Sequence, residues 1–363
     1  MPIDQRRLDT DYATARTRFL DAATRAGAQV TSSSHPDRGR DGEELAVDVA
    51  TLGAADADAV LLVVSGTHGV EGFAGSAIQS WWLDERAADL SETFSDQLRV
   101  VLVHGLNPVG FSWVRRVNED NVDLNRNFID WSTQAPRNEG YDALAADLVP
   151  SAWDDETIGT TTTALLERAA EIGMDWLQQA VSGGQYDHPT GVFYGGTKPV
   201  WSHEWLVRRL PEMAASCDRL VVLDLHTGLG PWGHAELISS DPADTAAYRR
   251  GTAWWGEVNS MVDGDSVSAE LSGDWLRTVP SLVPDAEVTA VAVEYGTVDM
   301  VSVLQSLRAD AWLHGHGDPS GPAAEAIRAQ VRAAFLDDDP AWVATIIERF
   351  DDICGVAVAQ LTA

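Results

Sequence analysis

Residues Val63–Ala77 read VVSGTHGVEGFAGSA, an apolar run that ends in a glycine-rich turn and leads into a segment of helical character. Glycines at a strand-to-helix turn often cradle phosphate groups, which would indicate a nucleotide site. However, the turn has neither a G-x-G-x-x-G register nor a G-x-x-x-x-G-K-[ST] motif. The same turn carries His68 and Glu71, which can share one metal ion. A metal site is therefore the second interpretation.

Strands and helices alternate around this turn. A strand, a helix and another strand in succession imply a right-handed crossover and a parallel core. Residues 32–44 are polar and are expected to form a turn-rich connection. Apolar runs predict strands at 45–52, 59–65, 98–104, 219–225, 235–239 and 288–294. Helical spacing predicts helices at 11–28, 74–86, 242–259, 299–313, 322–336 and 340–353.

These elements indicate one α/β domain over residues 1–363, with a mostly parallel, mixed sheet and helices on both faces. Residues 130–190 differ from their surroundings because they are rich in Ala, Asp, Thr and Gly. Within them, residues 164–179 have helical character. We interpret residues 130–190 as an insertion over the sheet rather than as a second domain.

Composition narrows the classes of function. The 363 residues are 45% hydrophobic and carry a formal net charge of -31, with Lys198 as the only lysine. Such a chain has no basic patch with which to bind nucleic acid. It contains no apolar run long enough to span a membrane, and its first residues are charged rather than apolar. We expect a cytoplasmic protein that binds neither membranes nor nucleic acids.

Two features of the composition leave alternatives open. The acidic charge fits a surface adapted to high salt, but it also fits the Arg-, Ala- and Asp-rich coding of a GC-rich genome. The tandem tryptophans Trp81-Trp82 and Trp254-Trp255 can pack in the core or form an interface between copies, so a homo-oligomer stays open. Cys217 and Cys354 lie in partly apolar surroundings and are expected to pack as small hydrophobic residues.

Two other strand ends carry residues that could bind a metal ion or take part in catalysis. The run LDLHTG at Leu223–Gly228 places His226 where a third metal ligand would lie, although a hydrogen-bonded core histidine is the alternative. The run VAVEYG at Val291–Gly296 places Glu294 at the end of an apolar strand. An isolated H-x-x-E pair occurs by chance in a chain of this length. The residues at these other strand ends therefore strengthen the interpretation of His68 and Glu71 as metal ligands.

The sequence RRVNEDNVDLNRNF at Arg115–Phe128 completes the set. With HGVE, NPVG, DLHTG and VAVEYG in the same order along the chain, it resembles the zinc carboxypeptidase (M14-like) superfamily. That superfamily includes the aspartoacylase and succinylglutamate desuccinylase deacylases. The runs GQYDHP at Gly184–Pro189 and GVFYGG at Gly191–Gly196 are similar to those of the DUF2817 group within it.

The resemblance implies a mononuclear zinc site. His68, Glu71 and His226 would hold one Zn²⁺ and leave a fourth position for water. Asp123 would accept a hydrogen bond from the distal nitrogen of His68 and orient its ring. Asp123 could instead cap a turn.

The resemblance also implies catalytic and substrate-binding roles. Glu294 would take a proton from water and pass it to the leaving nitrogen. Arg116 would polarise the scissile carbonyl, whereas Asn125 and Arg126 would bind a substrate carboxylate. Arg116 could instead pair with surface acids, and Tyr194 could either lie near the site or pack in the core.

Together these roles imply a zinc-dependent metallohydrolase that cleaves an amide bond near a free carboxylate, in a short peptide or an N-acyl amino acid. The first alternative is an aspartoacylase- or desuccinylase-type deacylase, which differs in whether the carboxylate belongs to the acyl or the amine side. The second is a zinc-bearing binding protein that has lost catalysis. A nucleotide-binding α/β protein is the third.

Overall fold

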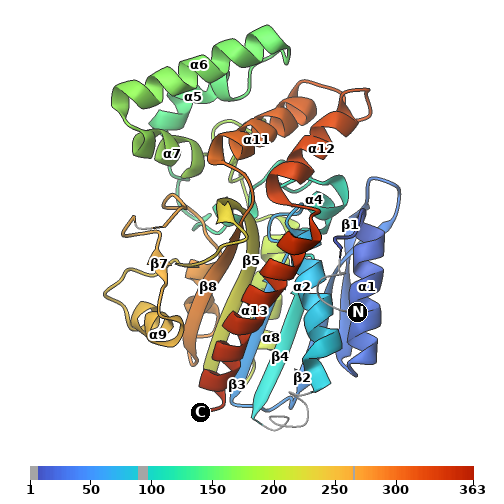
Figure 1. Cartoon of the computed structure of the whole chain (residues 1–363). Coiled ribbons are helices and arrows are strands. Elements are labelled where there is room, and N and C mark those ends of the chain that lie inside the picture. Colours follow the sequence, from blue (N-terminus) through green and yellow to red (C-terminus); the bar gives the residue numbers. More distant parts are fainter. Residues whose placement is uncertain (1–6, 89–96, 265) are drawn as a thin grey trace.

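A computed structural model describes residues 7–88, 97–264 and 266–363. Within them, the centre of the molecule is an eight-stranded mixed sheet with the strand order β1-β2-β4-β3-β5-β8-β6-β7 (Figure 1). The strands are β1 (Gln29–Arg38), β2 (Glu44–Gly53), β3 (Ala59–Ser65), β4 (Leu98–His104), β5 (Arg219–Trp232), β6 (Ala235–Ser239), β7 (Asn259–Ser260) and β8 (Glu287–Gly296).

The middle of the sheet is parallel, as the sequence predicts. β4, β3, β5 and β8 pair in parallel, whereas β2 and β6 join this core antiparallel on either side. Every residue of β3 and β4 is buried, because helices cover both faces of the sheet at this point. The carboxyl ends of β3, β5 and β8 therefore meet at one edge, where an open α/β sheet places its ligands.

Helices lie on both faces of the sheet, so the predicted α/β fold class is confirmed. The side chains of Leu61 and Val63 pack into one core with the helices of the first face, and those of Val60 and Leu62 into a second core on the other face. The first face carries α1 (Tyr12–Arg25), α2 (Gly72–Glu85), α9 (Ala246–Trp255) and α13 (Pro340–Leu361). The second face carries α8 (Trp201–Met213), η3 (Leu276–Thr278) and α10 (Val279–Leu282).

The expected turn-rich connection at residues 32–44 is confirmed for residues 39–43, which form the turn between β1 and β2, but it is wrong for residues 32–38. Residues 29–38 form β1, which pairs antiparallel with β2 from Gln29 opposite Thr51 to Arg38 opposite Glu44. β1 is an edge strand whose residues are mostly exposed, and His35 is the buried exception. An edge strand with little buried surface needs no apolar run, which is why its polar sequence predicts a loop.

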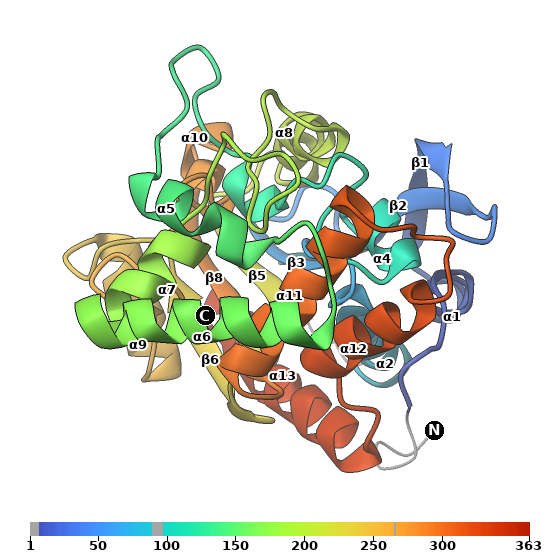
Figure 2. The same ribbon diagram turned by 90° about the horizontal axis from the view of Figure 1, so that it is seen from above.

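Three helices form a layer above the carboxyl ends of the central strands (Figure 1). They are α5 (Glu139–Leu148), α6 (Asp155–Ile172) and α7 (Met174–Ser182). The predicted helical character of residues 164–179 is confirmed, but it belongs to two helices, because Gly173 adopts a φ of 125° and separates α6 from α7. Seen from above, α6 crosses over α11 (Met300–Gly315), and α12 (Ala324–Phe335) follows α11 (Figure 2). Residues 130–190, interpreted as an insertion, contain this layer.

Several shorter features complete the fold. α4 (Pro108–Trp113) and η2 (Leu124–Arg126) lie in the connection after β4. Cys217 and Cys354 are buried free thiols, and Trp81 and Trp82 are buried in the core. In the part of the chain that the structure describes, no helix combines the length and the apolar character needed to cross a bilayer.

Candidate metal centre

The turn after β3 is pressed against the loop around α4. Gly66 adopts a φ of 71°, a conformation that favours glycine, and a Cβ at Gly69 would lie 2.0 Å from the carbonyl carbon of Gly110. The Gly69 amide donates a hydrogen bond to the carbonyl oxygen of Arg116 at 3.1 Å. The glycines of the opening stretch therefore let two loops meet, and they bring Arg116 beside His68.

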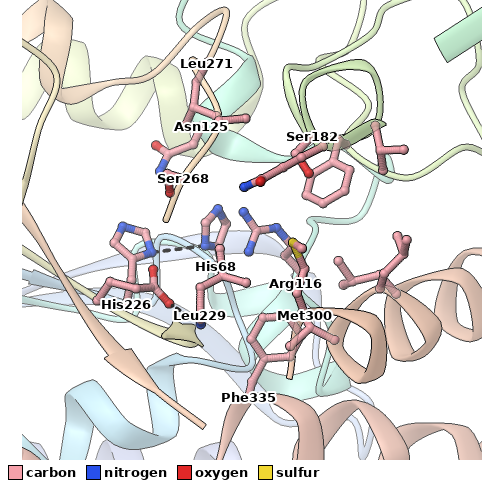
Figure 3. Close-up of a pocket in the computed structure, with 18 of the residues that line it drawn as sticks. His68, Arg116, Asn125, Ser182, His226, Leu229, Ser268, Leu271, Met300 and Phe335 are labelled. Atoms are coloured by element: carbon pink, nitrogen blue, oxygen red, sulfur yellow. Dashed lines mark hydrogen bonds between the residues drawn. The ribbon is translucent and has the colours of Figure 1, made fainter. Parts of the chain in front are cut away.

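Three buried side chains converge at the carboxyl edge of the sheet. His68 Nδ1 lies 3.0 Å from Glu71 Oε1, and His226 Nδ1 lies 2.9 Å from Glu71 Oε2. The two Nδ1 atoms are 3.1 Å apart, and the two rings face each other (Figure 3). All three side chains are at most 3% exposed as residues. The potential ligand atoms of this group lie within 4.8 Å of one another.

A carboxylate faces the far nitrogen of each histidine. His68 Nε2 lies 3.2 Å from Asp123 Oδ1, and His226 Nε2 lies 2.7 Å from Asp224 Oδ2. An ionised carboxylate only accepts hydrogen bonds, so each Nε2 carries a proton. In a neutral imidazole the lone pair is then on Nδ1. Two lone pairs and the Glu71 carboxylate therefore point at one place, which is the donor set that a divalent cation requires.

The pKa shifts of Glu71 and His226 also indicate that this group of side chains is stabilised by positive charge. Burial works to raise the pKa of Glu71, but the adjacent His68 and His226 outweigh it and lower this pKa. Burial works to lower the pKa of His226, but the Asp224 and Glu71 carboxylates outweigh it and raise this pKa well above its ordinary value. Without a metal ion, a proton is held among these acceptors.

Asp224 is a member of the centre to which the sequence analysis assigned no role. Its Oδ1 accepts a hydrogen bond from Thr67 Oγ1 at 2.7 Å, and its Oδ2 accepts one from Trp275 Nε1 at 2.7 Å. Alternate residues of a strand point to the same face, so Asp224 and His226 lie together on β5. A charged residue inside the apolar run of β5 is the signal that could have revealed it.

Strand register places Glu294 next to the metal group. In the parallel pair of β5 and β8, Glu294 lies opposite His226. Glu294 Oε1 accepts a hydrogen bond from the Leu229 amide at 2.9 Å. Burial and the negative charge of Glu71 raise the pKa of Glu294 to about 7. A carboxyl with this pKa can both accept and release a proton near neutral pH.

The two adjacent arginines have separate roles. Arg115 Nε donates to both carboxylate oxygens of Asp310 on α11, at 3.2 and 2.9 Å. Arg116 instead turns to the metal group, where its Nε donates to Asp123 at 2.9 Å and its Nη1 to Glu71 at 3.2 Å. Its Nη2 has no hydrogen-bond acceptor among the residues described here. Arg116 lines the cavity beside the histidines.

Asn125 and Arg126 lie on the wall of the same cavity. Asp123 caps the short helix η2 by accepting the Asn125 amide, so the turn cap and the contact with His68 exist together. Arg126 donates from Nε to the carbonyl of Ser182 at 3.0 Å. Phe193, at a φ of 53°, places its ring 5.4 Å from the Arg116 guanidinium and 5.2 Å from that of Arg126. Both cations therefore lie within cation–π distance of this ring.

Two other candidates lie away from the centre. Tyr194 packs in the core beside α8, and its carbonyl accepts the amide of Asp123 at 2.8 Å. His35, Asp37 and Glu119 form a further group that could hold a metal ion. However, His35 Nδ1 accepts the Asp37 amide at 3.1 Å, and both acids are exposed, so fewer ligand atoms are available.

Comparisons with known proteins give the family. The family model of DUF2817, described as a protein of unknown function, matches residues 9–349. No curated protein matches the sequence.

Three solved structures have folds similar to that of this chain. Carboxypeptidase A from Helicoverpa armigera is 12% identical with a TM-score of 0.46, over 92% of this chain and 75% of that one. Bovine thrombin-activatable fibrinolysis inhibitor, in complex with tick carboxypeptidase inhibitor, is 12% identical with a TM-score of 0.46, over 99% of both chains. An aspartoacylase family protein from Mesorhizobium loti is 14% identical with a TM-score of 0.38, over 74% of this chain and 61% of that one. Because the family model spans nearly the whole chain, the chain belongs to the DUF2817 family.

Proposed function

We propose that this chain is a zinc-dependent hydrolase that cleaves an amide bond next to a free carboxylate, in a short peptide or an N-acyl amino acid. The observation that carries the proposal is the convergence of His68, Glu71 and His226 within 4.8 Å at one buried point. Two histidines and one glutamate form a common ligand set of catalytic zinc, in which a fourth position stays open. A zinc ion bound there would polarise a carbonyl oxygen and lower the pKa of water.

Glu294 is the proposed general base and acid. It lies beside His226 in the strand register, and the Leu229 amide fixes one of its carboxylate oxygens. Its carboxylate would accept a proton from the attacking water and deliver it to the leaving nitrogen.

Arg116 is the proposed electrophilic group. Its hydrogen bonds to Asp123 and Glu71 hold the guanidinium in place, which leaves Nη2 to bind the carbonyl oxygen of the amide. Negative charge grows on that oxygen during attack, and a fixed cation stabilises it by about 3 kcal/mol. The cost of ordering the arginine is met in folding rather than in the reaction.

Asn125 and Arg126 are proposed to bind the substrate carboxylate. Neither side-chain polar atom of Asn125 has a hydrogen-bond partner among the described residues, so its amide Nδ2 is available to donate to a carboxylate. Arg126 supplies a neighbouring positive charge that Asp123, 3.6 Å away, only partly balances. A carboxylate placed here would receive charge-assisted hydrogen bonds.

The test uses the full chain loaded with zinc and a panel of N-acyl amino acids and dipeptides. We expect hydrolysis that is lost on chelation and restored by zinc. Glu294→Gln is expected to keep its zinc and to lose at least about 100-fold in kcat, because only proton transfer is removed. Activity that survives both chelation and Glu294→Gln would exclude this mechanism.

The same panel, together with N-succinyl amines whose only carboxylate is on the acyl side, separates the alternatives. Hydrolysis only of substrates whose carboxylate is on the acyl side would assign the chain to the deacylase type. Zinc binding without turnover of any substrate would favour the binding protein that has lost catalysis.

A further inference from the structure

A cavity of about 150 Å³ opens from the metal centre into the layer of helices above it. One end is polar and contains His68, Arg116, His226 and Glu294. The rest of the cavity is mainly apolar. It is lined by side chains of α6 and α7, which belong to the layer, and of the neighbouring α11. These apolar side chains include Leu165 and Leu166 of α6, Leu177 of α7, and Met300, Val301 and Leu304 of α11.

The same cavity gathers apolar side chains that are exposed to solvent. Leu166 is 47% exposed, Met174 46%, Met300 40% and Val301 47%, and all four line the cavity. Single exposed apolar residues are common on protein surfaces, but a cluster around one opening marks a binding surface. The mouth of the cavity is therefore apolar as well as its interior.

Hydrogen bonds hold this apolar wall in a fixed position. Arg308 of α11 is fully buried and donates to Thr161 Oγ1 at 2.6 Å and Thr162 Oγ1 at 2.9 Å, both on α6. It also donates to the carbonyl oxygens of Asp147 at 2.7 Å and Leu148 at 2.9 Å, at the end of α5. α6, which lines the cavity, is thus tied to α11, so this part of the wall is preformed.

We infer that the cavity is a specificity pocket for a large apolar group of the substrate. This group would have the size of a benzoyl ring or of a chain of about six carbons. The inference rests on the proposed function, because it places the scissile amide at the polar end. A cavity of this volume lined by Leu, Ile and Phe is large enough for benzene. The polar end and the apolar wall together select an amide that joins a carboxylate to a bulky apolar group.

The apolar group can be on either side of the amide, and the experiment distinguishes the two. One arm compares N-acetyl-, N-hexanoyl- and N-benzoylglycine as substrates of the zinc-loaded chain. The other arm compares N-acetylglycine with N-acetylleucine and N-acetylphenylalanine. Each buried methylene is expected to raise kcat/KM about fourfold, so one arm rises on the order of 100-fold from its smallest to its largest member. A change below about threefold in both arms would overturn the inference.

Variants on the exposed wall test the location without disturbing the core. Leu166→Asp is expected to reduce the ratio of kcat/KM between the largest and the smallest substrate at least tenfold. Ile172→Asp is the matched control, because Ile172 also lies on α6, is 50% exposed and is not part of the cavity wall. An equal effect of both substitutions would contradict the assignment of this wall.

Binding measurements separate this inference from the proposed function. The dissociation constants of the same compounds are measured by calorimetry on the metal-free chain. If no compound is hydrolysed but affinity still rises with apolar size, and Leu166→Asp removes that rise, the pocket stands and the hydrolase proposal fails. If small and large substrates are hydrolysed equally, the hydrolase proposal stands and the pocket is excluded.

Discussion

The two histidines of the metal centre point the same nitrogen at each other because an aspartate holds the other nitrogen of each ring. Asp123 and Asp224 fix the tautomers of His68 and His226, and Arg116 and Trp275 in turn hold the aspartates. Such supports make an imidazole a better ligand by orienting it and raising its basicity. The chemistry of the centre therefore depends on residues that would not touch the metal.

We expect Asp224→Asn to weaken zinc affinity about 10- to 100-fold, because the amide no longer draws a proton to His226 Nε2. Competition with a chromogenic chelator measures this change. Asp310→Asn is the matched control, because Asp310 is also buried but pairs with Arg115 rather than with a ligand. Equal losses in the two variants would show a general effect on stability and contradict the role of Asp224.

The sequence predicts the candidate ligands better than the residues that support them. His68, Glu71 and His226 lie at strand ends within short motifs, so pattern and order along the chain reveal them, and the structure brings them together. Trp275 reaches Asp224 from η3, on the second face of the sheet. No spacing in the sequence encodes that contact, because only the tertiary packing of η3 creates it.

His104 gives stability a pH dependence that is independent of the metal. It is fully buried at the end of β4 and stacks on Phe19 with the ring centroids 4.4 Å apart. Burial lowers the pKa of His104 from 6.5 to about 4. Between these values the unfolded chain binds a proton that the folded chain does not. The free energy of unfolding therefore falls as the pH falls from 6.5 to 4, by about 3 kcal/mol at about 1.4 kcal/mol per pH unit.

Urea unfolding of the wild type and of His104→Gln at several pH values measures this effect. The variant is expected to lack about 3 kcal/mol of the loss between pH 6.5 and 4, whatever its stability at neutral pH. His316→Gln, at an exposed position after α11, serves as the control. Parallel pH curves for the wild type and His104→Gln would be inconsistent with a neutral buried imidazole.

At the scale of elements, the apolar strands are predicted well and the polar ones are not. The central parts of β3, β4, β5 and β8 are buried on both faces, so their sequences are mostly apolar. β1 lies at the edge and reads as a loop, whereas the break between α6 and α7 rests on the backbone of Gly173. Buried strands have apolar runs that can be recognised in the sequence. An exposed strand such as β1, or a helix break at a single glycine, has no comparable pattern.

The layer of α5, α6 and α7 depends on Arg308, whose guanidinium is buried among neutral acceptors. We expect Arg308→Met to lower the free energy of unfolding by about 3 kcal/mol, because carbonyl and hydroxyl groups on α5 and α6 lose their donors. Hydrogen exchange should also become faster in α6 than in α13. Urea unfolding and exchange detected by mass spectrometry measure both effects.

Arg168→Met is the control for this prediction. Arg168 also lies on α6, but its side chain is 49% exposed and pairs only with Glu171 among the described residues. Its loss is expected to change stability by less than about 0.5 kcal/mol. Similar exchange rates in the wild type and Arg308→Met would contradict the role of Arg308 as the anchor of the layer.

At the scale of the whole molecule, the acidic charge contrasts with the site. The chain has a formal net charge of -31, yet Arg116 and Arg126 place two guanidiniums in one cavity. Repulsion among the acids opposes folding at low ionic strength, where the screening length is about 30 Å at 0.01 M, compared with about 3 Å at 1 M. These two guanidiniums would attract the carboxylate of the substrate proposed above, despite the acidic surface.

Thermal unfolding between 0.01 and 1 M KCl measures this repulsion. We expect the unfolding temperature to rise with KCl, because screening weakens the repulsion more in the compact folded state than in the expanded unfolded one. A chain that is unfolded in dilute buffer would support adaptation to high salt, and one that is folded there would favour the composition of a GC-rich genome. A melting temperature that is independent of KCl would contradict repulsion as a significant cost.

The position of a bound metal ion tests the central claim most directly. Crystals of the zinc-loaded chain, measured on both sides of the zinc absorption edge, give that position without any assumption about substrate. The account predicts one anomalous peak between His68 Nδ1, His226 Nδ1 and the Glu71 carboxylate. A peak only at His35, Asp37 and Glu119, or none at the His68 group, would contradict it.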